Sequence, residues 1–379
     1  MNTEKTGWRL ISNVLIKALL LFVAVNLLWM VVFPNAAIGK LSLYNRLWPG
    51  RERLPFGEDI NQSYNLSLSN LDAMFASHMI AQEKAEDEFR IIVIGDSSIW
   101  GTLLQPQETL PAQLQQSLAG YGSEADKQIK VYNLGYPTLS LLKDLMILEK
   151  AKQYQADLIL WAITLQSMPE HSQYDSAIVQ QNTALILQMS EQYPKLMDER
   201  LQKPARVQTN LISRRRNLAD LYRLQLLGFM WGASGIDQVY PAEYPRAQVD
   251  LPAETSFAEM NPPELEEEAL AFDLITAGYD IAGETPLILI NEPIMISNGE
   301  NSKIRYNYYY PKWAYDQYRD YLLISCAAAG WECLDYWNAL PMVQFTNTAI
   351  HYSAKGAEAF AEILAKDLIG LELLPNVNN

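Results

Sequence analysis

Arg90-Ile-Ile-Val-Ile-Gly95-Asp96-Ser97-Ser98-Ile99-Trp100-Gly101 is the stretch of this 379-residue sequence that decides the fold. Its unbroken apolar run, 91–94, is typical of a strand buried on both faces of a parallel sheet. Gly-Asp-Ser follows at the point where the chain leaves the carboxyl edge of the sheet, the edge that carries the binding crevice in open α/β sheets. Ser97 is therefore a candidate nucleophile with free backbone N–H groups beside it. The alternative is that Asp96 and Ser97 only cap the next helix.

The rest of the chain repeats this alternation of strand and helix. Further strand-like segments occur at 129–138, where the strand ends in turn residues, and at 157–164, 286–293 and 331–337, and segments with helical spacing of apolar residues separate them. Strands that alternate with helices of about ten to fifteen residues indicate βαβ units. We therefore predict an α/β fold with a five-stranded parallel sheet, built from residues 89–379.

Residues 168–285 interrupt the alternation with helix-like and irregular sequence. We interpret this block as a helical insertion that contributes no strand to the sheet and covers part of the crevice. Within it, Ser213-Arg214-Arg215-Arg216 precedes an aromatic amphipathic stretch. Such a run suits contact with anionic lipid, but it is more often the solvated start of a helix.

Composition excludes several classes of function. A hydrophobic share of 49% supplies a large core, and the net charge of −15 argues against a nucleic-acid partner, which needs a basic surface. Cys326 and Cys333 match no zinc or redox spacing, so we interpret them as small core residues and leave a disulfide between them open. The sequence calls for no metal and no cofactor.

The segment from Val14 to Phe33 is almost wholly apolar and is long enough to cross a bilayer once. A cleaved signal peptide has a shorter apolar region, so we favour an uncleaved anchor, with a buried helix as a further alternative. Basic residues flank both ends, and we place the short tail inside because it then needs no translocation. The predicted organisation is a tail with a transmembrane helix (1–38), a collar (39–88) and an extracytoplasmic domain (89–379).

Ser97 and His351 are the residues that we expect to carry chemistry. Ser97 follows the first strand and His351 precedes the last helix, so both belong to the same edge of a doubly wound sheet. A serine hydroxyl needs a base to take its proton, and histidine is suited to this near neutral pH.

Together these elements resemble the SGNH or GDSL-type hydrolases. The resemblance rests on Ile94-Gly95-Asp96-Ser97-Ser98 near the start, on Asp335-Tyr-Trp337, and on the segment Phe345-Thr-Asn-Thr-Ala-Ile-His351-Tyr-Ser353-Ala-Lys-Gly356. It implies a flavodoxin-like three-layer α/β/α fold with Ser97 as nucleophile and His351 as base for ester bonds. The layout is also similar to that of membrane-anchored relatives associated with cell-surface polysaccharide modification.

The sequence departs from the family pattern at three places. Thr348 stands where the family has its acid, three residues before the histidine. His351 must then be oriented by Asp335, Glu292, a backbone carbonyl or the Thr348 hydroxyl. The second-block glycine appears as Thr138, or as Gly135 if the turn shifts, and no asparagine lies near 164–166 where the third block falls. The candidate oxyanion and substrate-binding residues are Ser98, Gly135, Thr138, Thr164, Gln166 and Asn291.

Two functional hypotheses follow. The first is a membrane-anchored serine esterase or O-acyltransferase that acts on acyl groups of an envelope or exported glycan, or on a small ester. The second is a catalytically degenerate relative that binds a glycan or scaffolds polysaccharide assembly, with polysaccharide-biosynthesis proteins as partners. A flavodoxin-like nucleotide protein is disfavoured because the loop after the first strand lacks the glycine spacing that lets backbone approach phosphate.

Overall fold

The structure is a computed structural model that describes residues 2–32, 50–56, 71–124, 127–193 and 244–375, together with positions 196, 218–219, 222, 226–227 and 230. Ser213-Arg214-Arg215-Arg216 lies outside the described residues. Seven short 3₁₀ helices accompany the elements named below: η1 (Met79–Ala81), η2 (Pro106–Glu108), η3 (Lys152–Tyr154), η4 (Leu165–Ser167), η5 (Glu170–Ser172), η8 (Glu267–Ala269) and η9 (Met342–Gln344).

A five-stranded parallel sheet forms the centre of the molecule, as the alternating pattern predicts. Its strands are β1 (Glu88–Ile94), β2 (Gln128–Asn133), β3 (Leu158–Ile163), β4 (Leu287–Asn291) and β5 (Glu332–Asp335). Their spatial order is β2-β1-β3-β4-β5 and every neighbouring pair is parallel. This is the flavodoxin-like doubly wound order, in which the connections reverse direction between β1 and β3 and open a crevice at the carboxyl edge. The predicted fold class is confirmed.

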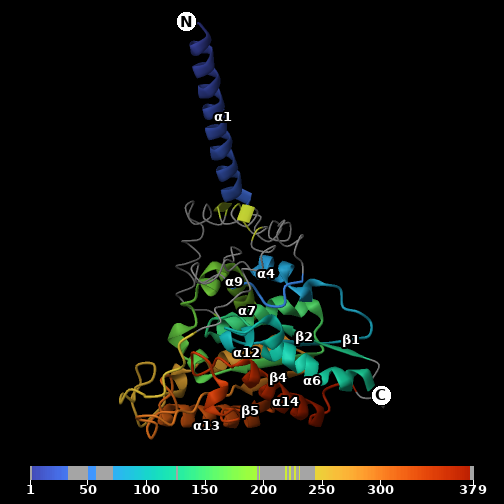
Figure 1. Cartoon of the computed structure of the whole chain (residues 1–379), viewed down its shortest axis with the longest axis vertical. Coiled ribbons are helices and arrows are strands. Elements are labelled where there is room, and N and C mark those ends of the chain that lie inside the picture. Colours follow the sequence, from blue (N-terminus) through green and yellow to red (C-terminus); the bar gives the residue numbers. More distant parts are fainter. Residues whose placement is uncertain are drawn as a thin grey trace.

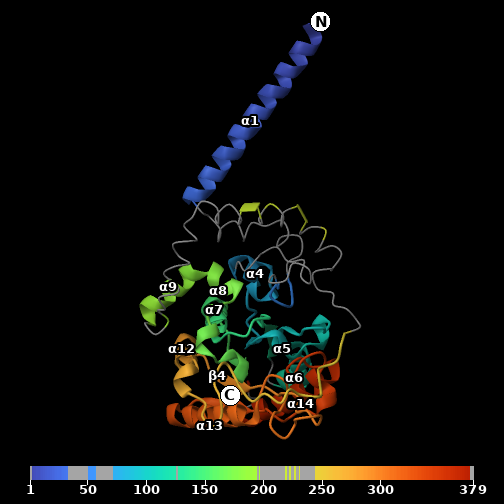
Figure 2. The ribbon, with the colours of Figure 1, turned by 90° about the vertical axis from the view of Figure 1, so that its left-hand side faces the viewer.

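Helices cover both faces of this sheet because its strands are apolar on both sides. Ile92 and Ile94 of β1 face the core that α7 (Leu141–Ala151), α12 (Phe272–Ala282) and α13 (Lys312–Ala329) complete. Ile91 and Val93 face the second core, which α6 (Leu110–Glu124) and α14 (Ala354–Gly370) cover. Figure 2 shows α12 and α14 on opposite sides of the strands. The three layers position all loops that follow the strands at one edge.

The block 168–285 needs a correction at its end. Helix α12 lies within that range, yet it packs beside α7 as a crossover helix of the sandwich and does not form part of a cap. The insertion itself ends near residue 270. There the chain returns to its starting point, because Pro169 pairs with Leu270 and the Ala271 N–H donates to the Met168 carbonyl at 2.8 Å. The insertion includes the α-helices α8 (Ala177–Gln181) and α9 (Thr183–Gln192). The described part of the block adds no strand to the sheet.

The described part of the collar packs directly onto the domain. Helix α4 (Leu71–Ser77) contributes to the first core, and Arg53 pairs with Asn133 at the end of β2. The Trp100 Nε1–H donates to the Leu54 carbonyl at 2.6 Å. The Arg53 guanidinium lies over the Trp100 ring, 4.4 Å from its centroid. Residues 50–56 therefore support the segment that follows β1.

Helix α1 (Asn2–Val32) projects away from the sheet and its covering helices (Figure 1). Its stretch Gly7–Trp29 has 23 residues and a mean hydropathy of 2.2, which is long and apolar enough to cross a membrane. Most of this stretch is exposed, with Trp29 at its end buried, and large side chains such as Leu15, Leu20 and Leu28 are more than half exposed. The helix is therefore not a core helix of the domain.

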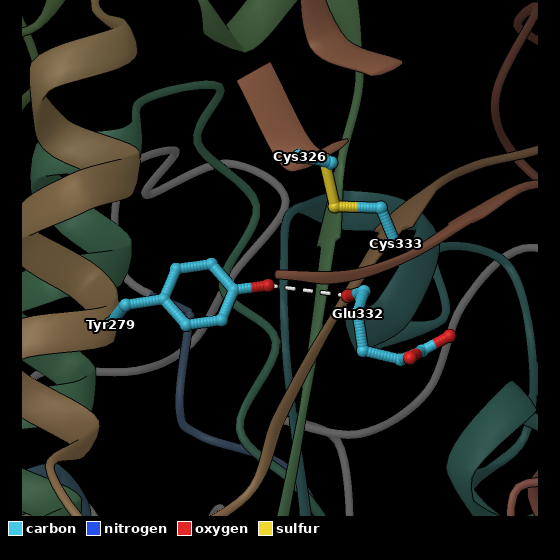
Figure 3. Close-up of a disulfide and its surroundings, with 4 residues drawn as sticks. All are labelled: Tyr279, Cys326, Glu332 and Cys333. Carbon is cyan, nitrogen blue, oxygen red and sulfur yellow. Dashed lines mark hydrogen bonds between the residues drawn. A yellow bond between two sulfur atoms is a disulfide. The ribbon is translucent and has the colours of Figure 1, made fainter. Parts of the chain in front are cut away.

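A disulfide joins Cys326 of α13 to Cys333 of β5 (Figure 3). Nearby, the Tyr279 hydroxyl of α12 donates to the Glu332 carbonyl at 3.2 Å, and the Tyr279 ring stacks on Trp331 at 4.5 Å. These contacts fasten the edge strand β5 to the helices that cover it. The bond settles the option that the sequence leaves open for the two cysteines.

Candidate active site

Ser97 is the first residue of the short helix α5 (Ser97–Trp100), three positions after the end of β1. The Asp96 side chain caps this helix by accepting from the Ser98 N–H at 2.8 Å. Gly95 permits the sharp exit from the sheet, because a Cβ there would lie 2.5 Å from Ile99 Cγ1 and 3.2 Å from the Ala162 carbonyl oxygen. Both readings of the Gly-Asp-Ser stretch thus apply: Asp96 caps, and Ser97 is left at the carboxyl edge of the sheet.

Lys143 is buried beneath this turn and holds it in place. Its Nζ donates to the carbonyls of Gly95 at 2.7 Å and Tyr136 at 3.2 Å, and it pairs with Asp144 at 2.5 Å. Burial raises the Asp144 pKa to about 6, although the Lys143 charge opposes that shift. A fully buried ammonium needs such a complete set of partners. Lys143 therefore connects the end of β1 to the loop after β2, a role that sequence analysis did not find.

His351 lies in a tightly bonded loop in front of α14. The loop is closed by an antiparallel bridge between Phe345 and Tyr352 and by a bond from the Thr346 N–H to the His351 carbonyl at 2.8 Å. The Thr348 hydroxyl accepts from the His351 N–H at 3.1 Å. Ser353 then caps α14 by accepting from the Gly356 N–H at 3.1 Å. The backbone of His351 is thus fixed on both sides.

The structure brings the two predicted residues together. His351 Nε2 lies 2.7 Å from Ser97 Oγ, although the residues are 254 positions apart. His351 Nδ1 lies 2.8 Å from Asn347 Oδ1. Because a carbonyl oxygen only accepts, Nδ1 must carry the proton, and in a neutral ring this leaves Nε2 free to accept from the serine hydroxyl. The result is a Ser-His-Asn arrangement with the tautomer that a general base requires.

Burial lowers the pKa of His351 from 6.5 to about 4. The cause is desolvation, which disfavours the charged imidazolium. The ring is therefore neutral, and able to take a proton, at any pH above about 5. The same burial makes the imidazolium costly once the proton has been transferred, and an amide offers it less charge stabilisation than a carboxylate does.

Asp335 does not orient His351. Its carboxylate accepts from Arg319 at 2.6 Å and from Asn291 Nδ2 at 2.8 Å, which commits it to the end of β5. Asn291 in turn is 1% exposed, and its Oδ1 accepts from the Tyr318 hydroxyl at 3.2 Å. The predictions for Asp335 as orienting acid and Asn291 as a substrate ligand therefore fail, because both side chains are used in packing β4, β5 and α13 together.

Glu292 does not contact the His351 ring either, but it connects the two halves of the site. Its Oε2 accepts from the Ser98 hydroxyl and, at 2.7 Å, from the Tyr352 hydroxyl. Ser98 follows the nucleophile and Tyr352 follows the histidine, so one carboxyl group ties both segments. Burial raises the pKa of Glu292 well above its ordinary value, and the Asp96 charge adds to this. The structure places Glu292 as a positioning residue.

Three predicted oxyanion donors are engaged elsewhere. Ser98 is 2% exposed, with its N–H bonded to Asp96 and its hydroxyl to Glu292. The Gly135 N–H donates to Asn133 Oδ1 at 3.0 Å, and the Thr138 N–H donates to the Tyr136 carbonyl at 2.6 Å. The prediction fails for the Ser98 N–H because Asp96 uses it to cap α5, and for the Gly135 and Thr138 N–H groups because the loop after β2 bonds its own amides in tight turns.

Few groups remain that could donate a hydrogen bond to an oxyanion. Within the described part of the chain the Ser97 N–H, at the start of α5, has no acceptor. The buried Thr138 hydroxyl likewise has no partner there. Thr164 is fully buried at the end of β3, whereas Gln166 is half-buried and lines a cavity. Among the described residues no group of three histidine, cysteine or acidic side chains is arranged to hold a metal ion.

Asn347 is the site residue that sequence analysis missed. It stands four residues before His351, one position away from Thr348. The Thr348 hydroxyl is turned toward the backbone N–H groups of Ile350 and His351. The residue that contacts Nδ1 of the His351 ring is therefore Asn347, one position before Thr348. The sequence signal that could have indicated Asn347 is its amide side chain, one position from the place where the family has its acid.

The chain is similar to several solved structures. A lipolytic protein of the G-D-S-L family from Veillonella parvula DSM 2008 is 10% identical, with a TM-score of 0.36 over 74% of this chain and 98% of its own. Est24, a carbohydrate acetylesterase from Sinorhizobium meliloti, is 9% identical, with a TM-score of 0.33 over 74% and 99%. An inhibitor-bound aryl esterase of M. smegmatis is 10% identical, with a TM-score of 0.33 over 74% and 99%. No protein-family model and no curated protein matches the sequence.

Proposed function

We propose that this protein is a membrane-anchored serine esterase or O-acyltransferase that acts on acyl groups of an envelope or exported glycan. The observation that carries the proposal is the line of contacts from Ser97 Oγ through the His351 ring to Asn347 Oδ1, at 2.7 and 2.8 Å. A serine hydroxyl within hydrogen-bond reach of an oriented imidazole is the arrangement that activates a nucleophile.

The reaction follows from these contacts. Neutral His351 takes the Ser97 proton at Nε2 as Oγ attacks the carbonyl carbon of the ester. The negative charge that develops on the carbonyl oxygen is stabilised by the Ser97 N–H. His351 then returns the proton to the leaving alcohol, and an acyl-serine remains. Water or a sugar hydroxyl attacks the acyl-serine in the second half, again with His351 as base. The first acceptor makes the protein an esterase and the second makes it a transferase.

The location outside the cytoplasm is supported by two features. Helix α1 leaves large apolar side chains such as Leu15, Leu20 and Leu28 exposed, which suits a lipid environment. The disulfide Cys326–Cys333 belongs to an oxidising compartment, since cytosolic thiols are kept reduced. Protease added to intact cells should degrade residues 244–375. Degradation only after lysis would place the domain inside.

The catalytic proposal is tested with full-length protein in detergent. Wild type should hydrolyse 4-nitrophenyl acetate and should be labelled at Ser97 by a fluorophosphonate probe, whereas Ser97→Ala should do neither. Thr102→Ser is the matched control: it removes only a methyl group from a half-buried side chain just after α5, keeps the hydroxyl, and should be labelled like wild type. Equal hydrolysis by wild type and Ser97→Ala would rule the proposal out.

 A second candidate function is a catalytically inactive glycan-binding or scaffold protein for polysaccharide assembly. It is favoured by the amide in place of an acid and by the engagement of the Gly135 and Thr138 amides within their own loop. The fluorophosphonate probe separates the two functions. Capture at Ser97 supports the enzyme, and the absence of capture in a folded sample supports the binding protein.

A further inference from the structure

A cavity of about 300 Å³ lies at the carboxyl edge of the sheet, the edge that also carries Ser97. Gln166, which lines it, follows β3, and β3 pairs directly with β1, the strand that leads to Ser97. The other walls come from the insertion, including η5, and from a tyrosine-rich loop after β4 (residues 305–310). They include His171, Phe257, Arg305, Tyr308 and Tyr309.

Backbone contacts connect this cavity to the segment that carries His351. Asn307 Nδ2 donates to the Met295 carbonyl at 2.9 Å, and the Met295 N–H donates to the Ala349 carbonyl at 2.7 Å. Asn307 Oδ1 also accepts from the Tyr309 N–H at 2.9 Å. The tyrosine-rich loop is therefore held, through Met295, to the loop that carries His351.

Arg305 gives the cavity a buried positive charge. The side chain is 4% exposed, and three of its five N–H groups donate to backbone carbonyls: Asn307 at 3.1 Å, Glu254 at 2.5 Å and Tyr308 at 2.7 Å. One N–H remains on each terminal nitrogen. Within the described part of the chain no carboxylate forms an ion pair with this guanidinium. The Glu254 carboxylate accepts from the Ser256 hydroxyl at 2.5 Å, and its charge opposes the lowering of the Arg305 pKa by burial.

The direct hydrogen-bond partners of this buried cation are all neutral carbonyls and two of its N–H groups are spare, an incomplete arrangement because buried charges in proteins are normally paired. The two free N–H groups suit a carboxylate, which a guanidinium binds with a pair of parallel hydrogen bonds. The rings of Tyr308 and Tyr309, whose centroids are 4.0 Å apart, and of Phe257 add flat apolar surface on which the C–H face of a sugar can pack. The volume is at the small end of ligand sites, which suits one sugar unit.

We propose that this cavity is a subsite for an acidic sugar, with Arg305 binding the carboxylate of a uronic acid residue and the aromatic side chains contacting its ring. The inference rests on the proposed function in that it identifies the glycan on which the acyl group is carried or received. The overall charge of −15 opposes a polyanion at long range. The local positive charge of Arg305 would therefore select a sugar whose acidic group can reach the cavity.

The test compares two ligands that differ only at the carboxylate, 4-nitrophenyl β-D-glucuronide and 4-nitrophenyl β-D-glucoside. Their binding to full-length Ser97→Ala in detergent is measured by calorimetry, which needs no turnover. The glucuronide should bind about tenfold more tightly, the effect of one charge-assisted contact. In the double variant with Arg305→Gln the two ligands should bind equally. Equal binding to the single variant, or a preference that survives Arg305→Gln, would overturn the proposal.

Two further variants guard against a loss of folding, because Arg305 ties three carbonyls. Arg305→Lys keeps the charge and should retain part of the preference for glucuronide. Tyr308→Ala removes ring contact and should weaken both ligands alike while their ratio stays unchanged. If inorganic phosphate displaced the glucuronide at a lower concentration than free glucuronate, the assignment to a sugar acid would be wrong. A preference for glucuronide in a protein that hydrolyses no ester would leave this inference standing and refute only the esterase.

Discussion

Replacing Asn347 by aspartate should turn the Ser-His-Asn arrangement into a faster Ser-His-Asp one. Burial lowers the His351 pKa from 6.5 to about 4, which disfavours the imidazolium by roughly 3 kcal/mol. A carboxylate about 4 Å from the centre of that charge contributes about 4 kcal/mol at an effective dielectric constant near 20. Asn347 is half-buried, so solvent screens part of this interaction.

After that screening we expect about 1.4 to 2.7 kcal/mol of transition-state stabilisation, which is a rise of about ten- to a hundredfold in kcat. The assay is hydrolysis of 4-nitrophenyl acetate by Asn347→Asp across pH 4 to 9. Because the carboxylate favours the charged ring, the acidic limb of the profile should move to higher pH together with the gain in rate. An unchanged rate with an unmoved acidic limb would show that Asn347 does not act on the His351 ring.

Thr348→Asp is the matched control for this experiment. The Thr348 hydroxyl accepts from backbone N–H groups and does not face the ring, so an aspartate there keeps the same turn and should leave kcat within about threefold of wild type. Asn347→Leu is the opposite test. It removes the acceptor that holds the proton on Nδ1 and should lower kcat by about tenfold or more. A gain at Thr348 with none at Asn347 would reverse the assignment.

Three further predictions follow from the site and its supports. Wild-type activity should stay constant from about pH 8 to pH 5 and fall with a midpoint near 4, since the lowered His351 pKa keeps the base neutral until then; a midpoint near 6.5 would contradict the burial argument. Glu292→Gln retains an acceptor for Ser98 and Tyr352 and should lower the free energy of unfolding by less than about 1 kcal/mol, whereas Glu292→Ala should cost about 2 to 4 kcal/mol in urea titrations. Replacing Cys326 and Cys333 by serine should cost about 2 to 3 kcal/mol, the value for so short a loop, with kcat unaffected.

The strands and their order in the chain could be predicted from local pattern. The run Ile91 to Ile94 is apolar at every position, and only a strand covered on both faces buries all four side chains. Helix α1 could also be predicted from the sequence, because its apolar composition alone distinguishes it from the domain. Helix α12 was placed in the wrong unit because its amphipathic pattern does not state which partner covers it, and contact with α7 decided that.

The features of the candidate site also divide into those that the sequence predicts and those that only the tertiary structure shows. The sequence by itself determined that Ser97 follows a buried strand, that His351 precedes a capped helix, and that the topology of a doubly wound sheet sends both to one edge. It could not determine which polar side chain meets Nδ1 of the ring. Asn347 and Thr348 differ by one position, and only the closed loop from Phe345 to Tyr352 turns the amide toward the ring and the hydroxyl toward the backbone.

The tertiary structure alone also decided which groups the acidic residues Asp335 and Glu292 bind. Asp335 and Glu292 both end strands at the correct edge, so the sequence offers each as a partner for His351. In the folded protein Arg319 from α13 donates to the Asp335 carboxylate, and the hydroxyls of Ser98 and Tyr352 donate to the Glu292 carboxylate. Hydrogen-bond partners that come from distant parts of the chain are set by packing, and burial then fixes the protonation of the groups involved, because desolvation depends on every neighbouring element and on no single stretch of sequence.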